Sequence, residues 1–485
     1  MSESASRDLG TGNLEDFRQA GHQLVDVLAD HLATLPSGPV WRPMPDHLRE
    51  QLLSLPLPDG PTSLGPLAET TARDVLPYAM GNGHPAFFGW VNSPPSLAGV
   101  LASMAAAVMN PSVVTGDHAD VHLECTTVRW LAELVGFPHQ PGGGLLTSGA
   151  SAATIVCLAG ARNRAAAAAG HDVRSEGLAD RPPLISYVPA EAHSCITRAI
   201  EVLGMGRASI RRVPLEHGRL DTDALRAAIA ADRAAGALPA LLVGSAGTVN
   251  TGAIDPLEAL ADVAAAERLW FHVDGAYGAF GKLDPAIAAR YSGMERADSL
   301  TLDPHKWLGV PIDAGCALVR RGDDLREAFS TIPPYLRQDV GEEVGTFAEY
   351  AFEQTRPFRA LKTWATIAAR GRDGIVDQVV RANALARELA AMVERDPELE
   401  LAVTPETSVV AFRARPPDCP PERVEAVNHA LPEAVQARGC AFVTGTIYDE
   451  RETLRACILH PGTTEDDLAT LVREVLTVAN GLASA

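Results

Sequence analysis

The pattern of apolar and polar residues predicts helices and strands in alternation. Apolar residues at helical spacing predict an amphipathic helix from Asn13 to Leu35, a helix from Leu97 to Val108 and another that begins at Val128. Strand-length apolar runs follow at 184–188, 240–244, 269–274, 299–302 and 316–320. Helical patterns separate several of these runs, which predicts right-handed βαβ units and a mainly parallel sheet.

One helix in this region has a specific start signal. Asp255 and Pro256 have the residue types of an N-cap and of a first helical residue. A helix is therefore expected to begin there, with the Asp255 carboxylate as its cap.

The last part of the chain has a different order of elements. After about Gly374 the pattern predicts a helix, strands at 399–403 and 408–413, a helix at 422–437, strands at 441–446 and 454–459, and a helix at 465–478. We therefore expect an N-terminal helical segment at 1–110, a large α/β domain at 111–370 and a small α+β domain at 371–485. No catalytic constellation is visible in the small domain.

Composition and charge narrow the class of protein. The 485 residues carry a formal net charge of −20, without a basic cluster, which argues against nucleic acid or an anionic membrane as partner. The polar start resembles no secretion signal, and no apolar run is long enough to cross a membrane. Seven scattered cysteines, with no Cys-x-x-Cys pair, suggest reduced thiols. We expect a cytoplasmic protein.

Two side chains at the ends of expected strands suggest chemistry. Lys306 follows the strand at 299–302, and Asp274 ends the strand at 269–274, 32 residues earlier. A lysine in such a place is more often a solvated loop residue, but a partly buried amine can attack a carbonyl. An aspartate and a lysine at one edge of a sheet are also the pair that pyridoxal phosphate (PLP) needs, for its ring nitrogen and its aldehyde.

The segments around this pair resemble a known family. Residues 272–277 (His-Val-Asp-Gly-Ala-Tyr) and 303–307 (Asp-Pro-His-Lys-Trp) are similar to motifs of the PLP-dependent group II amino-acid decarboxylases, the family of aromatic-L-amino-acid decarboxylase. The resemblance implies a fold-type-I enzyme in which Lys306 binds the cofactor covalently and Asp274 faces its ring nitrogen. It also implies that Ala276 packs on one face of the ring and that His305 lies in the cofactor site.

A glycine-rich turn is the candidate phosphate site. Small residues at 142–154 precede a helix expected to reach about Ala169, so free backbone N–H groups and the helix dipole would face one anion. An ordinary capped helix is the alternative, and a nucleotide P-loop is unsupported because no Gly-Lys-Ser/Thr follows. The resemblance implies that Gly149, Ala150 and Ser151 hold the cofactor phosphate.

The resemblance assigns three further side chains. It implies that His193, which by itself suggests a surface histidine, stacks on the cofactor ring, and that Thr248 lies beside the ring. It also implies that Tyr335, on a segment without clear periodicity, returns a proton to the substrate carbon.

The substrate is less clearly indicated. The resemblance makes Trp90 and Ser93 candidates for substrate contact, and Trp90 with the Phe87/Phe88 pair favours an aromatic side chain, although such rings more often belong to a core. The segment 117–124, expected to be a loop near the site, departs from the Ser-Pro-x-x-Thr-x-x-Glu pattern of the aromatic decarboxylases and favours a polar side chain instead. Its His and Asp residues fit no standard metal spacing, so no metal is expected.

The sequence therefore predicts a PLP-dependent decarboxylase of an L-amino acid, with an aromatic substrate favoured. An aldehyde synthase, aminotransferase or lyase of fold type I is the nearest alternative, and a non-catalytic cofactor-binding scaffold is another. Family members are dimers, so we expect a homodimer with the active site at the subunit interface and the 13–35 helix as a clasp.

Overall fold

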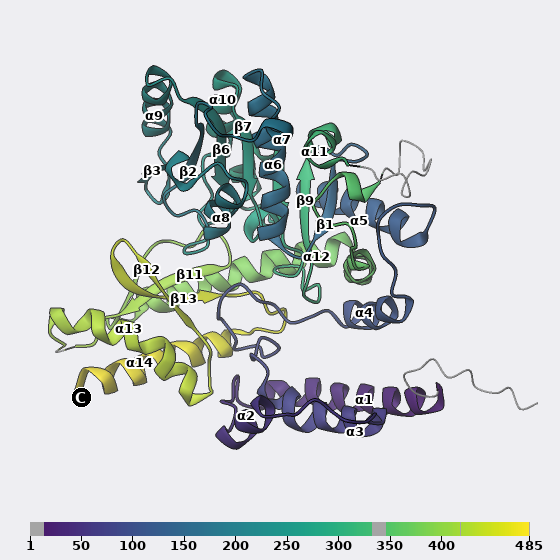
Figure 1. Cartoon of the computed structure of the whole chain (residues 1–485). Helices are drawn as coiled ribbons and strands as arrows, with labels where there is room; N and C mark the ends of the chain where they lie inside the picture. Colours follow the sequence, from purple (N-terminus) through teal and green to yellow (C-terminus); the bar gives the residue numbers. More distant parts are fainter. Residues whose placement is uncertain (1–13, 332–345, 418, 485) are drawn as a thin grey trace, which may run out of the picture.

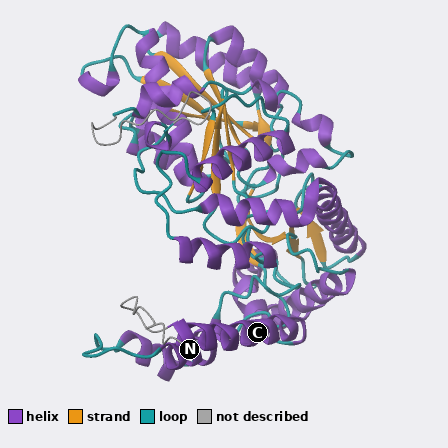
Figure 2. Cartoon of the chain, turned by 90° about the vertical axis from the view of Figure 1, so that its right-hand side faces the viewer, coloured by secondary structure: helices purple, strands orange, loops and turns teal. Residues whose placement is uncertain are grey.

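The computed structural model describes residues 14–331, 346–417 and 419–484. A large α/β region forms the upper part of Figure 1, and a smaller sheet with its helices lies below it. The N-terminal helices α1 (Leu14–Thr34), α2 (Asp46–Leu53) and α3 (Leu64–Thr70) lie along the lower edge. In both views these helices stand apart from the large region (Figure 2).

The central sheet confirms the expected mainly parallel α/β fold. Its strand order is β1-β9-β8-β7-β6-β2-β3, and only β9 runs antiparallel to its neighbours. The strands are β1 (Gly144–Thr147), β2 (Leu184–Pro189), β3 (Ile210–Val213), β6 (Leu238–Ser245), β7 (Trp270–Asp274), β8 (Ser299–Leu302) and β9 (Gly315–Val319). A two-stranded ribbon of β4 (Leu215–Glu216) and β5 (Arg219–Leu220) follows β3. The strand β1 was not expected from the sequence.

Helices cover both faces of this sheet (Figure 2). The helix α6 crosses β6 to β9, and α9 and α10 pack on β6. The helices of this region are α4 (Leu97–Met109), α5 (Ala119–Val135), α6 (Ala150–Ala168), α7 (Val173–Glu176), α8 (Ser194–Val202), α9 (Thr222–Ala234), α10 (Leu257–Glu267) and α11 (Gly322–Phe329). Because helices shield both faces, β2 and β8 are buried along their whole length, as parallel strands usually are, and so is the antiparallel β9.

The register of the parallel strands brings Asp274 and the turn that carries Lys306 to one edge of the sheet. Ser245 at the end of β6 pairs with Asp274 at the end of β7, and Asp274 pairs with Thr301 of β8. The chain leaves β8 one residue later and reaches Lys306 within a short turn. In parallel sheets this carboxyl edge is where ligands bind.

Two sequence expectations are wrong in detail. The helix α5 begins at Ala119, not at Val128, so most of the expected loop 117–124 is helical. Its first turns face the interior through Val121 and Glu124, and a buried glutamate hides the helical period of apolar residues.

The second difference concerns Asp255. The helix α10 begins at Leu257, and Pro256 precedes it without a side-chain cap. The carboxylate of Asp255 instead accepts hydrogen bonds from Leu220 N and Ser245 N, both at 2.8 Å. It therefore joins β6 to the β4–β5 ribbon, because two buried N–H groups without strand partners need an acceptor.

The small C-terminal sheet is antiparallel, with the order β10-β11-β13-β12. Its elements are β10 (Leu399–Leu401), β11 (Val409–Ala414), α13 (Pro421–Arg438), β12 (Thr444–Tyr448), β13 (Arg451–Cys457) and α14 (Glu465–Ser484). The helix α12 (Arg359–Arg395) joins it to the large region and breaks its helical geometry at Gly371, where φ is +64°. No helix in the described part of the chain is long and apolar enough to cross a membrane.

Candidate active site

A cavity of about 460 Å³ lies at the carboxyl edge of the central sheet, where β6, β7 and β8 end. Backbone segments from the large region, the C-terminal sheet and the stretch before α4 meet in its wall. Its lining includes Trp90, Asn92, Ser148 to Ala152, His193, Cys195, Ser245, Gly247 to Val249, Asp274, Ala276, Tyr277, Asp303, His305, Lys306 and Arg455.

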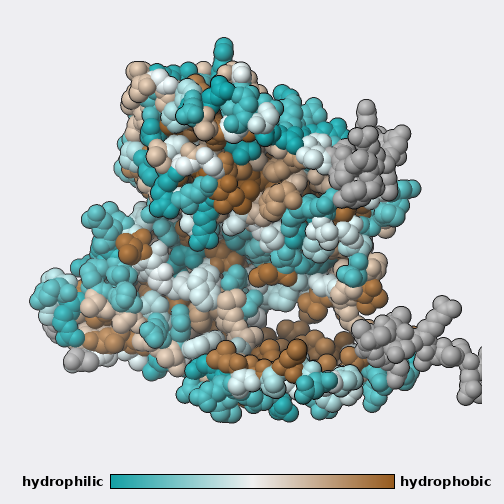
Figure 3. Space-filling view, in the orientation of Figure 1, coloured by the Kyte–Doolittle hydropathy of each residue, from teal (hydrophilic) through white to brown (hydrophobic). Residues whose placement is uncertain are grey.

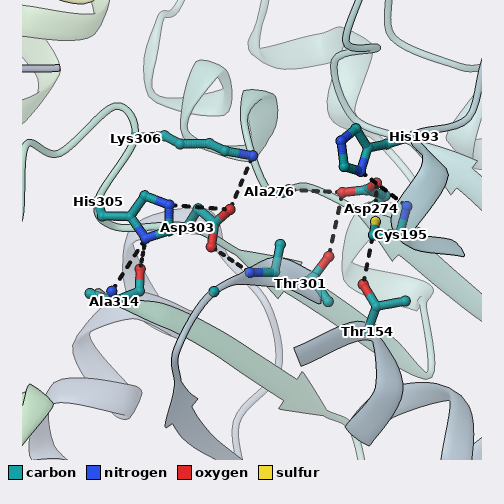
Figure 4. Close-up of polar contacts among 12 residues, drawn as sticks. Thr154, His193, Cys195, Asp274, Ala276, Thr301, Asp303, His305, Lys306 and Ala314 are labelled. Atoms are coloured by element: carbon teal, nitrogen blue, oxygen red, sulfur yellow. Dashed lines mark hydrogen bonds and ion pairs between the residues drawn. The ribbon is translucent and has the colours of Figure 1, made fainter. Parts of the chain in front are cut away.

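Lys306 reaches the cavity from the turn that follows β8 (Figure 4). Its Nζ lies 3.0 Å from Oδ2 of Asp303, and about a fifth of the side chain is exposed, at 22%. Ser93 donates a hydrogen bond to the carbonyl of Lys306 and so supports the turn from behind. The amine is thus accessible from the cavity while its backbone is held in place.

Asp274 faces the same cavity from the end of β7. Its Oδ1 accepts a hydrogen bond from Ala276 N at 3.1 Å and lies 3.5 Å from Thr301 Oγ1. Its Oδ2 lies 3.9 Å from the thiol of Cys195. Lys306 and Asp274 therefore share one cavity, as their positions after neighbouring strands predict.

His193 caps helix α8 on the same side of the cavity as Asp274 (Figure 4). Its Nδ1 accepts a hydrogen bond from Cys195 N at 3.2 Å, which fixes the orientation of the ring. Burial lowers the pKa of His193, and nearby Lys306 lowers it further against the opposing effect of Asp274. The imidazole is therefore neutral at physiological pH, as suits a ring that packs against another ring.

The candidate phosphate-binding site is the start of α6. Gly149 precedes the helix, and the backbone of Ser148 to Ala152 lines the cavity. The first N–H groups of a helix have no partner within it, so they can bind an anion. Thr248 lies in the wall, where its hydroxyl is 2.9 Å from that of Thr251.

Of the two residues expected to contact substrate, the structure places one in the cavity wall and the other outside it. Trp90 lines the cavity, is 46% exposed and packs against Phe442 at a centroid distance of 5.3 Å. Ser93 is buried beneath the Lys306 turn and is not among the lining residues. Phe87 and Phe88 are also buried outside the lining, so they give no support to an aromatic substrate. Tyr335 lies outside the described residues.

Several lining residues were missed by sequence reasoning, and three of them, Asp303, Cys195 and Arg455, carry ionisable side chains that bear on the chemistry of the site. Asp303 stands within the lysine motif, but no role was derived for it. Cys195 lies beside Asp274, and its burial, with the Asp274 charge, raises its pKa to about 12, so it is a neutral thiol. Arg455 comes from β13, in the small domain for which no catalytic role was expected.

Arg455 had a recognisable sequence signal. It is an arginine within an apolar strand pattern, and such a residue needs a buried partner or a ligand. Its side chain donates hydrogen bonds to the carbonyls of Val249, at 2.5 Å, and Trp90, at 3.2 Å. Its Nη2 is buried without a hydrogen-bond partner among the residues that the structure describes.

The fold and the cavity together define an α/β enzyme built to hold PLP. The chemistry of the lining fits this cofactor: an amine for its aldehyde at Lys306, an acid for its ring nitrogen at Asp274, a neutral imidazole at His193, and helix N–H groups for its phosphate. Ala276 is small enough to let a flat ring approach β7.

Comparison with known proteins places the chain in a family. Residues 45–415 match the pyridoxal-dependent decarboxylase conserved domain. The chain belongs to this family of PLP-dependent decarboxylases, which are carboxy-lyases, and its cofactor is PLP. The family expected from the two motifs is therefore confirmed.

Individual relatives cover nearly the whole chain. An aromatic-L-amino-acid decarboxylase of Bacillus atrophaeus is 31% identical over 96% of both chains. A phenylacetaldehyde synthase of Arabidopsis thaliana is 29% identical, again over 96% of each. The crystal structure of Oryza sativa TDC with PLP and tryptamine has a TM-score of 0.89 at 27% identity, and the match covers 97% of this chain and 99% of that one.

Proposed function

We propose that this enzyme removes the carboxylate of an aromatic L-amino acid as carbon dioxide and releases the corresponding amine. The observation that carries the proposal is the shared cavity of Lys306, Asp274 and Trp90. The half-exposed indole of Trp90 offers a flat apolar surface on which an aromatic side chain can pack. The decarboxylases of aromatic amino acids among the relatives support the same substrate class.

The lining residues divide the work of holding the cofactor. Lys306 Nζ would bind it covalently, the N–H groups of Gly149, Ala150 and Ser151 would hold its phosphate, and Asp274 would keep the proton on its ring nitrogen. His193 and Ala276 would enclose the ring, with Thr248 and His305 beside them. When bound, PLP supplies a ring that accepts the electron pair released as the bond from Cα to the carboxylate breaks.

Arg455 is our candidate for recognition of the substrate carboxylate. It brings a buried positive charge to the cavity wall, and Nη2 is its one nitrogen without a hydrogen bond to the described residues. A guanidinium binds a carboxylate strongly when both are removed from water. The backbone carbonyls of Trp90 and Val249 hold the side chain in position, so it would orient the carboxylate next to the indole.

The final proton separates the amine from the aldehyde outcome. We propose that Tyr335 donates this proton to Cα, as the family resemblance implies, which leads to the amine. An aldehyde synthase among the relatives makes aldehyde the rival product.

The test is a panel of the common amino acids with the full-length holoenzyme, in which carbon dioxide, amine, aldehyde and peroxide are measured together. We expect equimolar carbon dioxide and amine from one or more of phenylalanine, tyrosine and tryptophan. Aldehyde with peroxide would identify the rival synthase, a polar substrate would overturn the aromatic assignment, and no carbon dioxide from any amino acid would overturn the proposal.

We also propose that the enzyme is a homodimer with its active site at the subunit interface. Apolar side chains are exposed along α1 (Leu14, Phe17, Val25, Leu32) and α4 (Leu97, Leu101, Met104, Val108, Met109). Figure 3 shows the apolar surface of the N-terminal helices turned toward the gap below α4. A second copy of the chain would cover such a surface, because a large apolar patch in water is unfavourable.

Two further assignments belong to this proposal. We propose a cytoplasmic location, which the seven free cysteines support because disulfides are rare there. We also propose the division into segments 1–110, 111–370 and 371–485. The break in α12 at Gly371 supports the second boundary, and most buried apolar residues after it form a cluster of their own.

A further inference from the structure

A buried carboxylate occupies the place where the cofactor phosphate is proposed to bind. Asp303 is 3% exposed and lines the same cavity as the start of α6. Its Oδ1 accepts a hydrogen bond of 2.6 Å from the backbone N–H of Ala150, the first residue of that helix. One of the N–H groups that an anion would use is therefore already bound to an anion.

The second oxygen of Asp303 binds Lys306, the residue proposed to hold the cofactor covalently. Oδ2 lies 3.0 Å from Lys306 Nζ and 3.7 Å from His305 Nε2. The carboxylate therefore forms an ion pair with the amine that would attack the cofactor aldehyde. Asp303 thus contacts both groups to which PLP would attach.

The other carboxylate of the cavity, Asp274, does not lie at the start of α6. His193 and Asp274 lie at the other wall, where they contact Cys195. The backbone of Gly149 runs close to Asp303, since a Cβ added to Gly149 would lie 3.8 Å from Oδ1 and 3.5 Å from His305 Cε1. A phosphate cradled by Gly149 would therefore lie against a second negative charge.

We propose that Asp303 competes with the phosphate of PLP for its binding site. In the cofactor-free protein the Asp303 carboxylate binds both the N-terminus of α6 and the Lys306 side chain. The proposal rests on the placement of the phosphate at Gly149 to Ser151 given above. Removal of this charge strengthens binding of any phosphate to the site.

The experiment measures phosphate binding rather than turnover. The full-length chain is stripped of PLP, and inorganic phosphate and then PLP are titrated into wild type, Asp303→Asn and Asp303→Ala. We expect both variants to bind each probe about tenfold more tightly than wild type. The Asn variant keeps the shape of the side chain, and the Ala variant offers no new hydrogen-bond donor.

A matched control removes a buried carboxylate elsewhere. Asp324 is also 3% exposed and lies outside the cavity lining, near Arg164 and Arg321. Asp324→Asn changes the net charge equally and should bind phosphate as wild type does.

The outcomes separate this inference from the proposed function. Equal or weaker binding in the Asp303 variants overturns the inference, and so does tighter binding in Asp303→Asn alone, because the new amide donor would explain it. If Asp303→Ala does not fold, Asp303→Ser replaces it. Asp303→Asn and Asp303→Ser should then bind phosphate and PLP more tightly than wild type by the same factor. A wild-type protein that forms no covalent PLP adduct at all would instead overturn the assignment of Lys306.

Discussion

Glu124 and Arg356 form an ion pair in which neither side chain is exposed to solvent, at 0% each. Glu124 also accepts a hydrogen bond from Leu146 N at 2.9 Å, and Arg356 lies over the ring of Phe347. The pair therefore joins α5 and β1 to the segment before α12. Oε2 of Glu124 and Nε of Arg356 have no hydrogen-bond partner among the described residues, so the pair is only partly satisfied.

This incomplete pairing predicts a specific pattern of stability. Glu124→Leu leaves a buried unpaired guanidinium and should lower the free energy of unfolding by about 3–5 kcal/mol. The double variant Glu124→Leu/Arg356→Met should lose less than either single variant, as measured by chemical denaturation. Glu133→Gln breaks a half-exposed pair with Arg129 and is the control, with an expected loss of at most about 1 kcal/mol. Additive losses would contradict the prediction.

Lys306→Ala should abolish covalent attachment of PLP. Wild type treated with borohydride should keep the cofactor through denaturation, as seen in the mass of the intact protein, and the variant should keep none. Lys282→Ala serves as the control, because Lys282 pairs with Glu295 away from the cavity. An adduct that persists in Lys306→Ala would show that another amine binds the cofactor.

Arg455→Gln should raise KM for the amino acid by about 10–100-fold, since a hydrogen bond to a charged group contributes about 1.5–3 kcal/mol. Arg455→Lys keeps the charge and should raise KM less. Steady-state kinetics at saturating PLP measure both. Arg451 lies on the same strand and pairs with Glu400 at the surface, so Arg451→Gln should leave KM unchanged. A wild-type KM in Arg455→Gln would exclude the arginine from substrate binding.

His272 should make the fold sensitive to acid. Burial lowers the pKa of His272 to about 4 in the folded protein. In the unfolded chain the imidazole is protonated below about pH 6.5, so between these two pH values the unfolded state binds a proton that the folded state does not. The contribution of neutral His272 is present above pH 6.5 and is lost as the pH falls toward 4. The loss amounts to roughly 3 kcal/mol.

The measurement is the free energy of unfolding between pH 4 and pH 7. His272→Gln should show a shallower decline than wild type, whereas His429→Gln, at an exposed site, should decline as wild type does. Parallel curves for wild type and His272→Gln would refute the linkage.

Leu101→Glu should dissociate the proposed dimer. Leu101 is 64% exposed on α4, and a carboxylate buried between subunits would be costly. Sedimentation velocity should show a dimer for wild type and a monomer for the variant. Val202→Glu, at an equally exposed apolar residue of α8, is the control and should remain dimeric. A monomeric wild type would refute the dimer itself.

The sequence alone determined the fold class and the meeting of Lys306 and Asp274 at one edge of the sheet, because both depend on local patterns. Strand-length apolar runs separated by helices predict a parallel sheet, and residues that follow parallel strands must meet at one edge. These local patterns predict that Lys306 and Asp274 lie close together, and the family resemblance then indicates a cofactor site there. The match of the family domain to residues 45–415 confirms the family that the motifs around them indicate.

Tertiary structure decided which polar side chains are paired inside the fold. Glu124 has the local pattern of a surface residue in a loop, and only its buried partner Arg356 explains why a glutamate lies on the buried face of α5. Asp255 has the local pattern of a helix cap, but the N–H groups that it satisfies come from other elements. Arg455 and Asp303 also have buried partners from other elements: the carbonyls of Val249 and Trp90 for Arg455, and Ala150 N for Asp303. Partners distant in sequence set the cost of burying a charge, and no local pattern records them.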